Sequence, residues 1–254
     1  MQPPIALAVA AHDPLGGAGL AADLTTFAAH RVHGMVAVSA VTAQRFGSVD
    51  RVEPTSPDLL AAQLDAILAE TVVDAVKIGL LSSADHVRLI AERIGPGLLP
   101  APVVDPVMVT GRGDRFVAEE VEAAARELLY PQAAVLTPNH DEADLLGPSH
   151  AELAALGADL VVITGGRREA DDTLIHADGT TEILAGEWID TKNVRGSGCT
   201  FAAAIASNLA HGSGLAVAAR DAKAFVAAQL LDSGSWELGP AGSAGPVSHR
   251  LPER

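Results

Sequence analysis

Several kinds of residue or segment are scarce in this chain, and each scarcity excludes a class of protein. A single cysteine, Cys199, rules out an internal disulfide framework and leaves no cysteine spacing typical of a zinc site. Lysine and arginine number 17 against 32 acidic residues, and the resulting formal net charge of −15 is poorly suited to binding nucleic acid or an anionic membrane. Aromatic residues make up only 3%, too few for a base-stacking surface. We see no apolar run long enough to span a bilayer and no signal peptide, so we expect a cytoplasmic protein.

Hydrophobic residues, in contrast, make up 48% of the 254 residues, which is enough for one large core. No linker or charge run divides the chain, so we predict one domain over residues 1–254. Short apolar runs alternate with longer amphipathic segments, which predicts an α/β fold with a mostly parallel sheet and helices on both faces. The expected strands are 5–11, 35–42, 75–78, 102–105, 134–136 and 160–164, with a hairpin within 173–189; the expected helices are 20–29, 57–70, 84–94, 118–129, 140–146, 199–210 and 215–231.

The cysteine lies in a glycine-rich turn at the expected start of a helix. Gly196 and Gly198 allow the backbone to approach a ligand closely, and together with Ser197 they precede Cys199. The first N–H groups of a helix have no partner within it, and with the helix dipole they form a site suited to a phosphate. A thiol in the first helical turn is expected to have a lowered pKa and could act as a base. The same residues also fit a buried structural cysteine after an ordinary turn.

Three further groups of polar residues follow expected strands or begin expected helices. Asp105 ends a buried strand, a position from which aspartate often holds Mg²⁺ in phosphoryl transfer, although it also fits a turn in a surface loop. Asn139 and Glu142 have the spacing of a helix N-cap and its N3 residue, which can equally be plain capping. Asp23 follows the turn Gly16-Gly-Ala-Gly19, where a first-turn acid is an equally good interpretation. Ligands of parallel sheets bind at the carboxyl ends of strands, where these residues are predicted to lie.

Taken in order, these blocks resemble the ribokinase-like small-molecule kinases, and most of all the hydroxymethylpyrimidine/phosphomethylpyrimidine kinases of thiamine biosynthesis. The residues that carry the resemblance span nearly the whole chain. They are Asp13-Pro, Gly16-Gly-Ala-Gly19 with Asp23, Val41-Thr-Ala-Gln44, Lys77-Ile-Gly79, Asp105-Pro-Val-Met108, Thr137-Pro-Asn139 with Glu142, Ile189-Asp-Thr-Lys-Asn193, Gly196-Ser-Gly-Cys-Thr200 and Gly245-Pro-Val247.

The resemblance implies a three-layer αβα sandwich and ATP-dependent phosphorylation of 4-amino-5-hydroxymethyl-2-methylpyrimidine and of its monophosphate. It also implies a Mg²⁺ requirement, a flap at Thr110–Asp114 that closes over ATP, and a homodimer. The implied roles are as follows: Cys199 as the base; Gly196, Ser197 and Gly198 as the anion hole; Asp105 and Glu142 toward Mg²⁺; Asn139, Thr164 and Lys192 toward ATP; Asp23 and Gln44 as hydrogen-bonding partners of the aminopyrimidine, with Val107, Ala11 and Leu80 around it.

The chain departs from the family pattern at several positions near the expected substrate. Ala11 and His12 replace a usual Gly-Ser/Thr, Leu80 replaces a usual Met and Arg195 replaces a usual His. Thr164 stands where many members have Lys, and the segment after Leu146 is about one helix shorter than expected. A pyridoxine/pyridoxal kinase on the same fold is therefore an alternative, which Thr164 favours and Gln44 disfavours. A non-catalytic ligand-binding regulator is a second alternative, against which the phosphoryl-transfer residues argue.

Overall fold

The nine-stranded sheet at the centre of the molecule is mostly parallel. It is seen in a computed structural model, which describes residues 2–108, 117–166 and 168–249. The strand order among these residues is β3-β2-β1-β4-β5-β6-β7-β8-β9, with antiparallel pairing only for β2–β3, β7–β8 and β8–β9. The strands are β1 (Ile5–His12), β2 (His33–Arg45), β3 (Ser48–Pro54), β4 (Ala75–Ile78), β5 (Val103–Val104), β6 (Val135–Leu136), β7 (Leu160–Ile163), β8 (Asp172–His176) and β9 (Thr181–Leu184).

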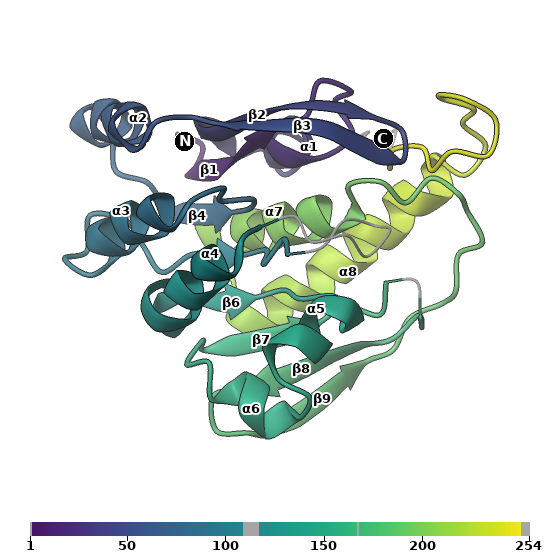
Figure 1. Ribbon diagram of the computed structural model, residues 1–254. Coiled ribbons are helices and arrows are strands. Elements are labelled where there is room, and N and C mark those ends of the chain that lie inside the picture. Colours follow the sequence, from purple (N-terminus) through teal and green to yellow (C-terminus); the bar gives the residue numbers. More distant parts are fainter. Residues whose placement is uncertain (1, 109–116, 167, 250–254) are drawn as a thin grey trace.

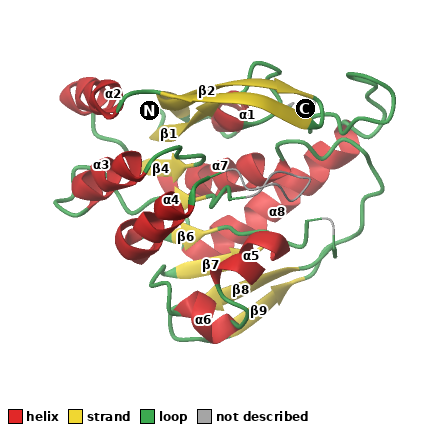
Figure 2. Ribbon diagram, in the orientation of Figure 1, coloured by secondary structure: helices red, strands yellow, loops and turns green. Residues whose placement is uncertain are grey.

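Helices cover both faces of this sheet (Figures 1 and 2). One face carries α2 to α6, and the other carries α1, α7 and α8, with α7 packed between the other two. The helices are α1 (Gly19–Ala29), α2 (Pro57–Glu70), α3 (Ala84–Ile94), α4 (Glu119–Ala124), α5 (His140–Leu146), α6 (His150–Ala154), α7 (Ser197–Ala210) and α8 (Leu215–Asp232). The predicted α/β class and its three layers are confirmed.

The central strand β1 shows why the sequence forms this sandwich. Its first seven residues are buried, because helices cover the sheet on both sides. Successive side chains point to opposite faces, so Leu7 and Val9 join the core under α2 and α3, while Ala6 and Ala8 join the core under α1 and α7. The alanines meet the alanine-rich helix α7, whose residues 202–206 are all buried, and small side chains on both surfaces let the helix approach the sheet closely.

The structure differs from the predicted elements in three places. Strand β3 was not predicted, because its sequence Ser-Val-Asp-Arg-Val-Glu-Pro is polar and its residues are exposed or half-buried, as an edge strand permits. Helix α6 was also not predicted. The predicted helix 118–129 is divided into α4 and a π-helical turn, Ala125–Leu129, followed by a 3₁₀ turn that contains Pro131.

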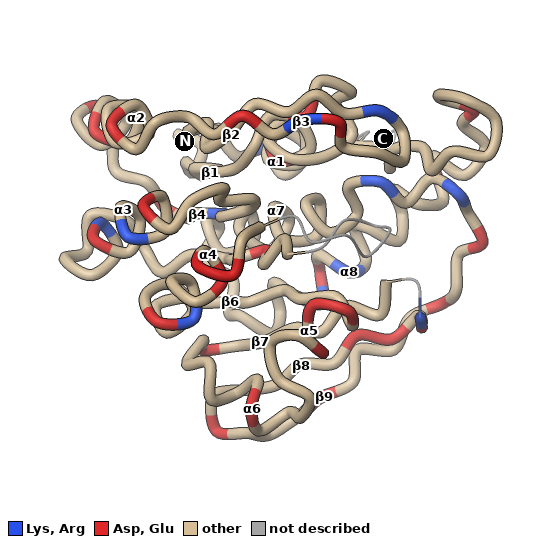
Figure 3. Tube along the Cα trace, in the orientation of Figure 1, with Lys and Arg blue, Asp and Glu red and all other residues tan. Residues whose placement is uncertain are grey.

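Acidic residues occur in most of the elements drawn in Figure 3, with basic residues between them along the chain. In the described part of the chain, none of the helices combines the length and the apolarity that crossing a bilayer requires.

Candidate active site

A cleft of ≈ 1000 Å³ lies at the carboxyl ends of the parallel strands. Its lining comes from the turns after β1, β4, β5, β6 and β7, the β2–β3 hairpin, the start of α7 and residues 241–244 near the C-terminus. The cleft brings together most of the residues that the sequence singled out, although they are spread over nearly 190 positions. These are Ala11, Gln44, Leu80, Asp105, Val107, Asn139, Glu142, Thr164, Gly196, Ser197, Gly198 and Cys199.

The start of α7 forms one wall of the cleft, and glycine is required there. Gly196 has φ +82°, and a Cβ at this position would lie 1.8 Å from the carbonyl oxygen of Gly17. Any side chain would therefore push apart the turn after β1 and the turn before α7. No side chain caps α7. The Ser197 N–H donates to the Val194 carbonyl oxygen at 3.2 Å, so the later N–H groups of the first turn are the ones that suit an anion in the cleft.

Cys199 contacts groups from two other turns. The Gly19 backbone acts to lower the pKa of the Cys199 thiol, and the Cys199 side chain acts to lower the pKa of Asp105. Burial raises the pKa of the thiol to about 12; the Lys77 charge lowers this pKa, while Asp105 and Asp23 raise it further. The sequence-based expectation of a lowered thiol pKa is therefore wrong, because desolvation and two carboxylates outweigh the helix start.

Lys77 lies at the floor of the cleft, and the sequence analysis gave it no role. Its ammonium is 2.9 Å from Asp23 Oδ1, and both side chains have an exposed fraction of 0%. Burial raises the pKa of Asp23 to about 6, although the Lys77 charge acts in the opposite direction. Gly79 makes room for the ammonium, since a Cβ there would lie 2.8 Å from Lys77 Nζ. The sequence held one signal for this pair: a lysine lies inside the apolar strand Ala-Val-Lys-Ile, and a buried lysine needs a buried partner for its charge.

Asp23 is consequently not at the surface of the cleft, where a contact with the aminopyrimidine would require it to lie. It is fully buried on α1, it does not line the cleft, and its carboxylate is committed to Lys77. We therefore interpret Asp23 as the structural partner of Lys77 and no longer as a residue that contacts the substrate.

Glu142 is both a capping residue and a buried acid. Its Oε2 accepts a hydrogen bond from the Asn139 N–H at 3.0 Å, and the Asn139 side chain accepts from the N–H groups of Asp141 and Glu142, which completes a capping box. Its Oε1 accepts from the Met108 N–H at 3.3 Å. Burial raises the pKa of Glu142 to about 8, and the negative charge of Asp105 raises it too. The capping interpretation is confirmed, and a role toward Mg²⁺ stays a prediction.

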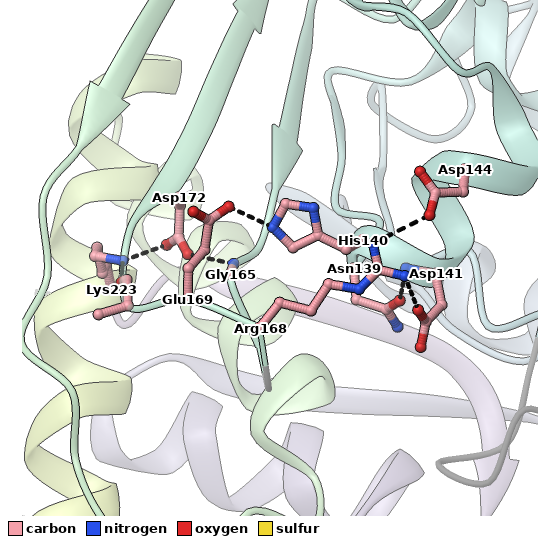
Figure 4. A network of polar contacts seen from close by, with 10 residues as sticks. Asn139, His140, Asp141, Asp144, Gly165, Arg168, Glu169, Asp172 and Lys223 are labelled. Carbon is pink, nitrogen blue, oxygen red and sulfur yellow. Dashed lines mark hydrogen bonds and ion pairs between the residues drawn. The ribbon is translucent and has the colours of Figure 1, made fainter.

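The turn after β7 is tied to its neighbours by the polar network in Figure 4. Asp172 accepts from the Gly165 N–H at 2.9 Å and pairs with Lys223 of α8 at 2.9 Å. On the other side, Arg168 pairs with Asp141 and Asp144 of α5, and His140 lies 2.6 Å from Glu169. These contacts hold the turn that follows Thr164. Thr164 itself lines the cleft beside Asn139.

Two other expectations are not supported by the cleft as described. Lys192 is exposed and does not line the cleft, so the structure gives no support to its expected contact with ATP. The next residue, Asn193, is fully buried and donates to the carbonyls of Ser233 and Trp236. The predicted flap Thr110–Asp114 lies outside the described residues.

Comparison with known proteins agrees with this geometry. A family profile described as phosphomethylpyrimidine kinase matches residues 13–248. The chain belongs to this family. It is 40% identical over 266 residues to the hydroxymethylpyrimidine/phosphomethylpyrimidine kinase of Synechococcus elongatus, with 99% of each chain covered. Among solved structures it is similar to a Bacillus subtilis pyridoxal kinase in complex with ADP (TM-score 0.87, 36% identity, 98% of each chain covered). It is also similar to the phosphomethylpyrimidine kinase of Clostridium difficile (TM-score 0.77, 29% identity, 89% of this chain and 98% of that one).

In this member of the phosphomethylpyrimidine kinase family, one end of the cleft is apolar. Ala11 and Leu80 are buried in a small hydrophobic cluster, against which Val107 packs. Gln44 stands at the same end, on β2. An apolar surface beside a single amide suits a flat ring with a polar edge.

Proposed function

We propose that this kinase transfers the γ-phosphoryl group of ATP to 4-amino-5-hydroxymethyl-2-methylpyrimidine and then to its monophosphate, acting as a single domain in thiamine biosynthesis. The observation that carries the proposal is the position of Cys199 in the first turn of α7, where it lines the same cleft as Gly19 and Asp105. The family profile and the Synechococcus elongatus relative support the substrate class.

The start of α7 stabilises the transferred group. In the first phosphorylation the hydroxyl oxygen of the substrate forms a bond to the γ-phosphorus as the bond from that phosphorus to the ADP oxygen breaks. Residues 196–198 line the cleft at the start of α7, and N–H groups of this turn are proposed to stabilise the charge that spreads over the phosphoryl oxygens. The proton of the hydroxyl goes to the sulfur of Cys199. A thiolate whose conjugate acid has a high pKa is a strong base, but it is a minority species near neutral pH, so activity should rise with pH.

Two carboxylates fit a magnesium ion in this cleft. Asp105 and Glu142 both line the cleft and both are buried. The negative charge of one disfavours ionisation of the other, and a bound cation would offset this repulsion. Among the described residues, none gather in a group of three or more that would by itself hold a metal. Mg²⁺ in kinases is usually bound by one or two carboxylates together with substrate phosphates, and it neutralises their charge. Asn139 and Thr164, from neighbouring turns, are proposed to contact ATP.

The apolar end of the cleft is proposed to bind the pyrimidine. Gln44 offers an amide donor and acceptor to the aminopyrimidine edge, with Ala11, Leu80 and Val107 against the ring. The second candidate is phosphorylation of pyridoxal, favoured by the likeness to the Bacillus subtilis pyridoxal kinase and by Thr164.

One assay separates these candidates. ATP consumption is measured with the pyrimidine, its monophosphate and pyridoxal, each alone, with Cys199→Ala as the inactive control. We expect the highest kcat/KM with the pyrimidine and measurable turnover of the monophosphate. Highest kcat/KM with pyridoxal would establish the second candidate, and no consumption with any of the three would favour a non-catalytic regulator. Size-exclusion chromatography with light scattering tests the proposed homodimer.

A further inference from the structure

A closed ring of hydrogen bonds joins three segments of the chain at the substrate end of the cleft. Arg195 Nη2 donates to Asp13 Oδ2 at 2.9 Å and to Gln44 Oε1 at 2.6 Å. Gln44 Nε2 donates to Thr42 Oγ1 at 2.7 Å, and Thr42 Oγ1 donates to the carbonyl oxygen of His12 at 2.8 Å. Since His12 is bonded covalently to Asp13, the ring is complete. It connects the end of β1, the edge of β2 and the turn before α7.

The backbone is shaped to bring these side chains together. The pairing of β2 with β3 shifts register between Ala43 and Gln44, and such a bulge re-aims the side chain at that point. Gly17 lets the turn after β1 pack closely against the segment that is hydrogen-bonded to Arg195, because a Cβ there would lie 3.0 Å from Pro246 Cβ. Arg195 itself is fixed by backbone hydrogen bonds to Gly245 and Val247. The ring therefore depends on several segments that are otherwise unconnected in sequence.

The ring determines which way the Gln44 amide faces. Guanidinium can only donate hydrogen bonds, so the amide oxygen must face Arg195. The Thr42 hydroxyl gives its only proton to His12, so it must accept from the amide nitrogen. The amide keeps one N–H and one oxygen lone pair for a ligand, in a fixed orientation.

We propose that Arg195 is a specificity-determining positioning residue, which holds the Gln44 amide in the one orientation that can pair with a donor–acceptor edge such as that of an aminopyrimidine. This inference rests on the proposed function, because Gln44 is taken as the residue that contacts the ring. Asp13 contributes to this positioning, because its side chain is only 1% exposed and its ion pair with Arg195 keeps the guanidinium in place. Nη2 of a guanidinium carries two protons, so this one nitrogen can donate to both Asp13 and Gln44.

The test measures binding without turnover. Dissociation constants for the pyrimidine and, separately, for ADP are determined by calorimetry for the wild type, Arg195→Met, Arg195→Lys and the control Arg93→Met. Arg93 is a matched control because its side chain is 13% exposed, it pairs with Asp65 at 2.7 Å, and it lies outside the cleft. We expect Arg195→Met to weaken pyrimidine binding about tenfold or more, since an unaligned amide loses much of its discrimination. Arg195→Lys should lose less, ADP binding should stay within about twofold, and Arg93→Met should change neither.

A double-mutant cycle with Gln44→Ala distinguishes positioning from general damage. If Arg195 acts through Gln44, Arg195→Met should change pyrimidine affinity less than about threefold once Gln44 is absent. Equal effects in both backgrounds, or parallel losses of pyrimidine and ADP, would overturn the proposal. Should Arg195→Met fail to fold in a thermal-unfolding measurement, the same cycle with Arg195→Lys decides between these outcomes.

The same binding measurements on the wild type show whether the proposed substrate is wrong, independently of the role of Arg195. A wild-type protein that binds pyridoxal and not the pyrimidine would contradict the proposed substrate. The cycle is then run with pyridoxal, where strong coupling between Arg195 and Gln44 upholds the positioning role and additivity overturns it.

Discussion

The ammonium of Lys77 and the carboxylate of Asp23 form an ion pair at 2.9 Å with neither side chain exposed to solvent. The pair joins β4 to α1 directly beneath the cleft. Both charges have lost their hydration, so each depends on the other, and removing one leaves a buried charge without compensation.

This pair leads to a prediction about stability. Lys77→Met should lower the free energy of unfolding by about 3–5 kcal/mol, because Asp23 is left buried and unpaired. The double variant Lys77→Met/Asp23→Leu should recover part of the loss. Arg88→Met is the control, since Arg88 and Asp85 form an exposed pair that contributes about 0–1 kcal/mol. Urea denaturation measures all four proteins, and single and double variants of equal stability would contradict the dependence of the two charges on each other.

The second prediction concerns magnesium and Glu142. Glu142→Gln removes a negative charge and keeps one oxygen to accept from either the Asn139 or the Met108 N–H. We expect a higher Mg²⁺ concentration for half-maximal rate and a lower kcat, measured by Mg²⁺ titration. Ser149→Ala, which removes the N-cap of α6 away from the cleft, should cost about 1 kcal/mol of stability and leave the Mg²⁺ titration unchanged. An unaltered titration in Glu142→Gln at full activity would reduce Glu142 to a capping residue.

The third prediction concerns Cys199 as the base. Cys199→Ala should lower kcat by about 10²–10⁴-fold with little change in nucleotide affinity. Cys199→Asp should recover part of this loss, because ribokinase-like enzymes generally have aspartate at the matching position. In the wild type, kcat should rise with pH over the neutral and mildly alkaline range, since burial raises the thiol pKa to about 12 and the thiolate fraction grows with pH below that value. A wild-type kcat and pH profile in Cys199→Ala would show that the thiol is only a packing group.

The fourth prediction concerns substrate choice. Gln44→Met removes the amide from the substrate end and should lower kcat/KM for the pyrimidine by about 10²-fold. The KM for ATP should hardly change, because Asn139 and Thr164 lie in turns after other strands. Steady-state kinetics with the pyrimidine and with pyridoxal make the test, and equal losses on both substrates would argue against a role in specificity.

The fifth prediction concerns acid stability. Burial lowers the pKa of His249 to about 4, and its Nε2 lies 2.9 Å from the hydroxyl of the fully buried Thr200. The imidazole has a pKa near 6.5 in the unfolded chain and about 4 in the folded protein, so between these pH values the unfolded chain binds more protons. The contribution of His249 to stability is therefore complete above about pH 6.5 and declines as the pH falls toward 4. His249→Gln should show a smaller decline of Tm between about pH 6.5 and 4. His33→Gln, at an exposed position, should follow the wild type, and an unchanged slope in His249→Gln would contradict the prediction.

The sequence by itself determined the parallel strands of the sheet and the place of the cleft. Alternation of short apolar runs with amphipathic segments requires parallel strands covered on both faces, and parallel strands end at one edge of a sheet. Residues that follow those strands, such as Asp105, Asn139 and Thr164, must then meet there whatever the details of packing. From the sequence, Gly196 was expected to let the backbone approach a ligand, whereas in the structure it approaches the carbonyl oxygen of Gly17, from which a Cβ would lie 1.8 Å away.

Only the tertiary structure decided how the charged groups are used. Asp23 and Lys77 are 54 positions apart, and their pairing follows from the packing of α1 against the sheet, not from any local pattern. The direction of the Cys199 pKa shift was likewise invisible in sequence, because burial and the carboxylates of Asp105 and Asp23 are contributed by other segments. The same holds for the contact of Arg195 with Gln44, which are 151 positions apart and meet through a bulge in an edge hairpin whose polar strand gave no signal. Desolvation and charge pairing are properties of the assembled fold, and local sequence patterns do not record them.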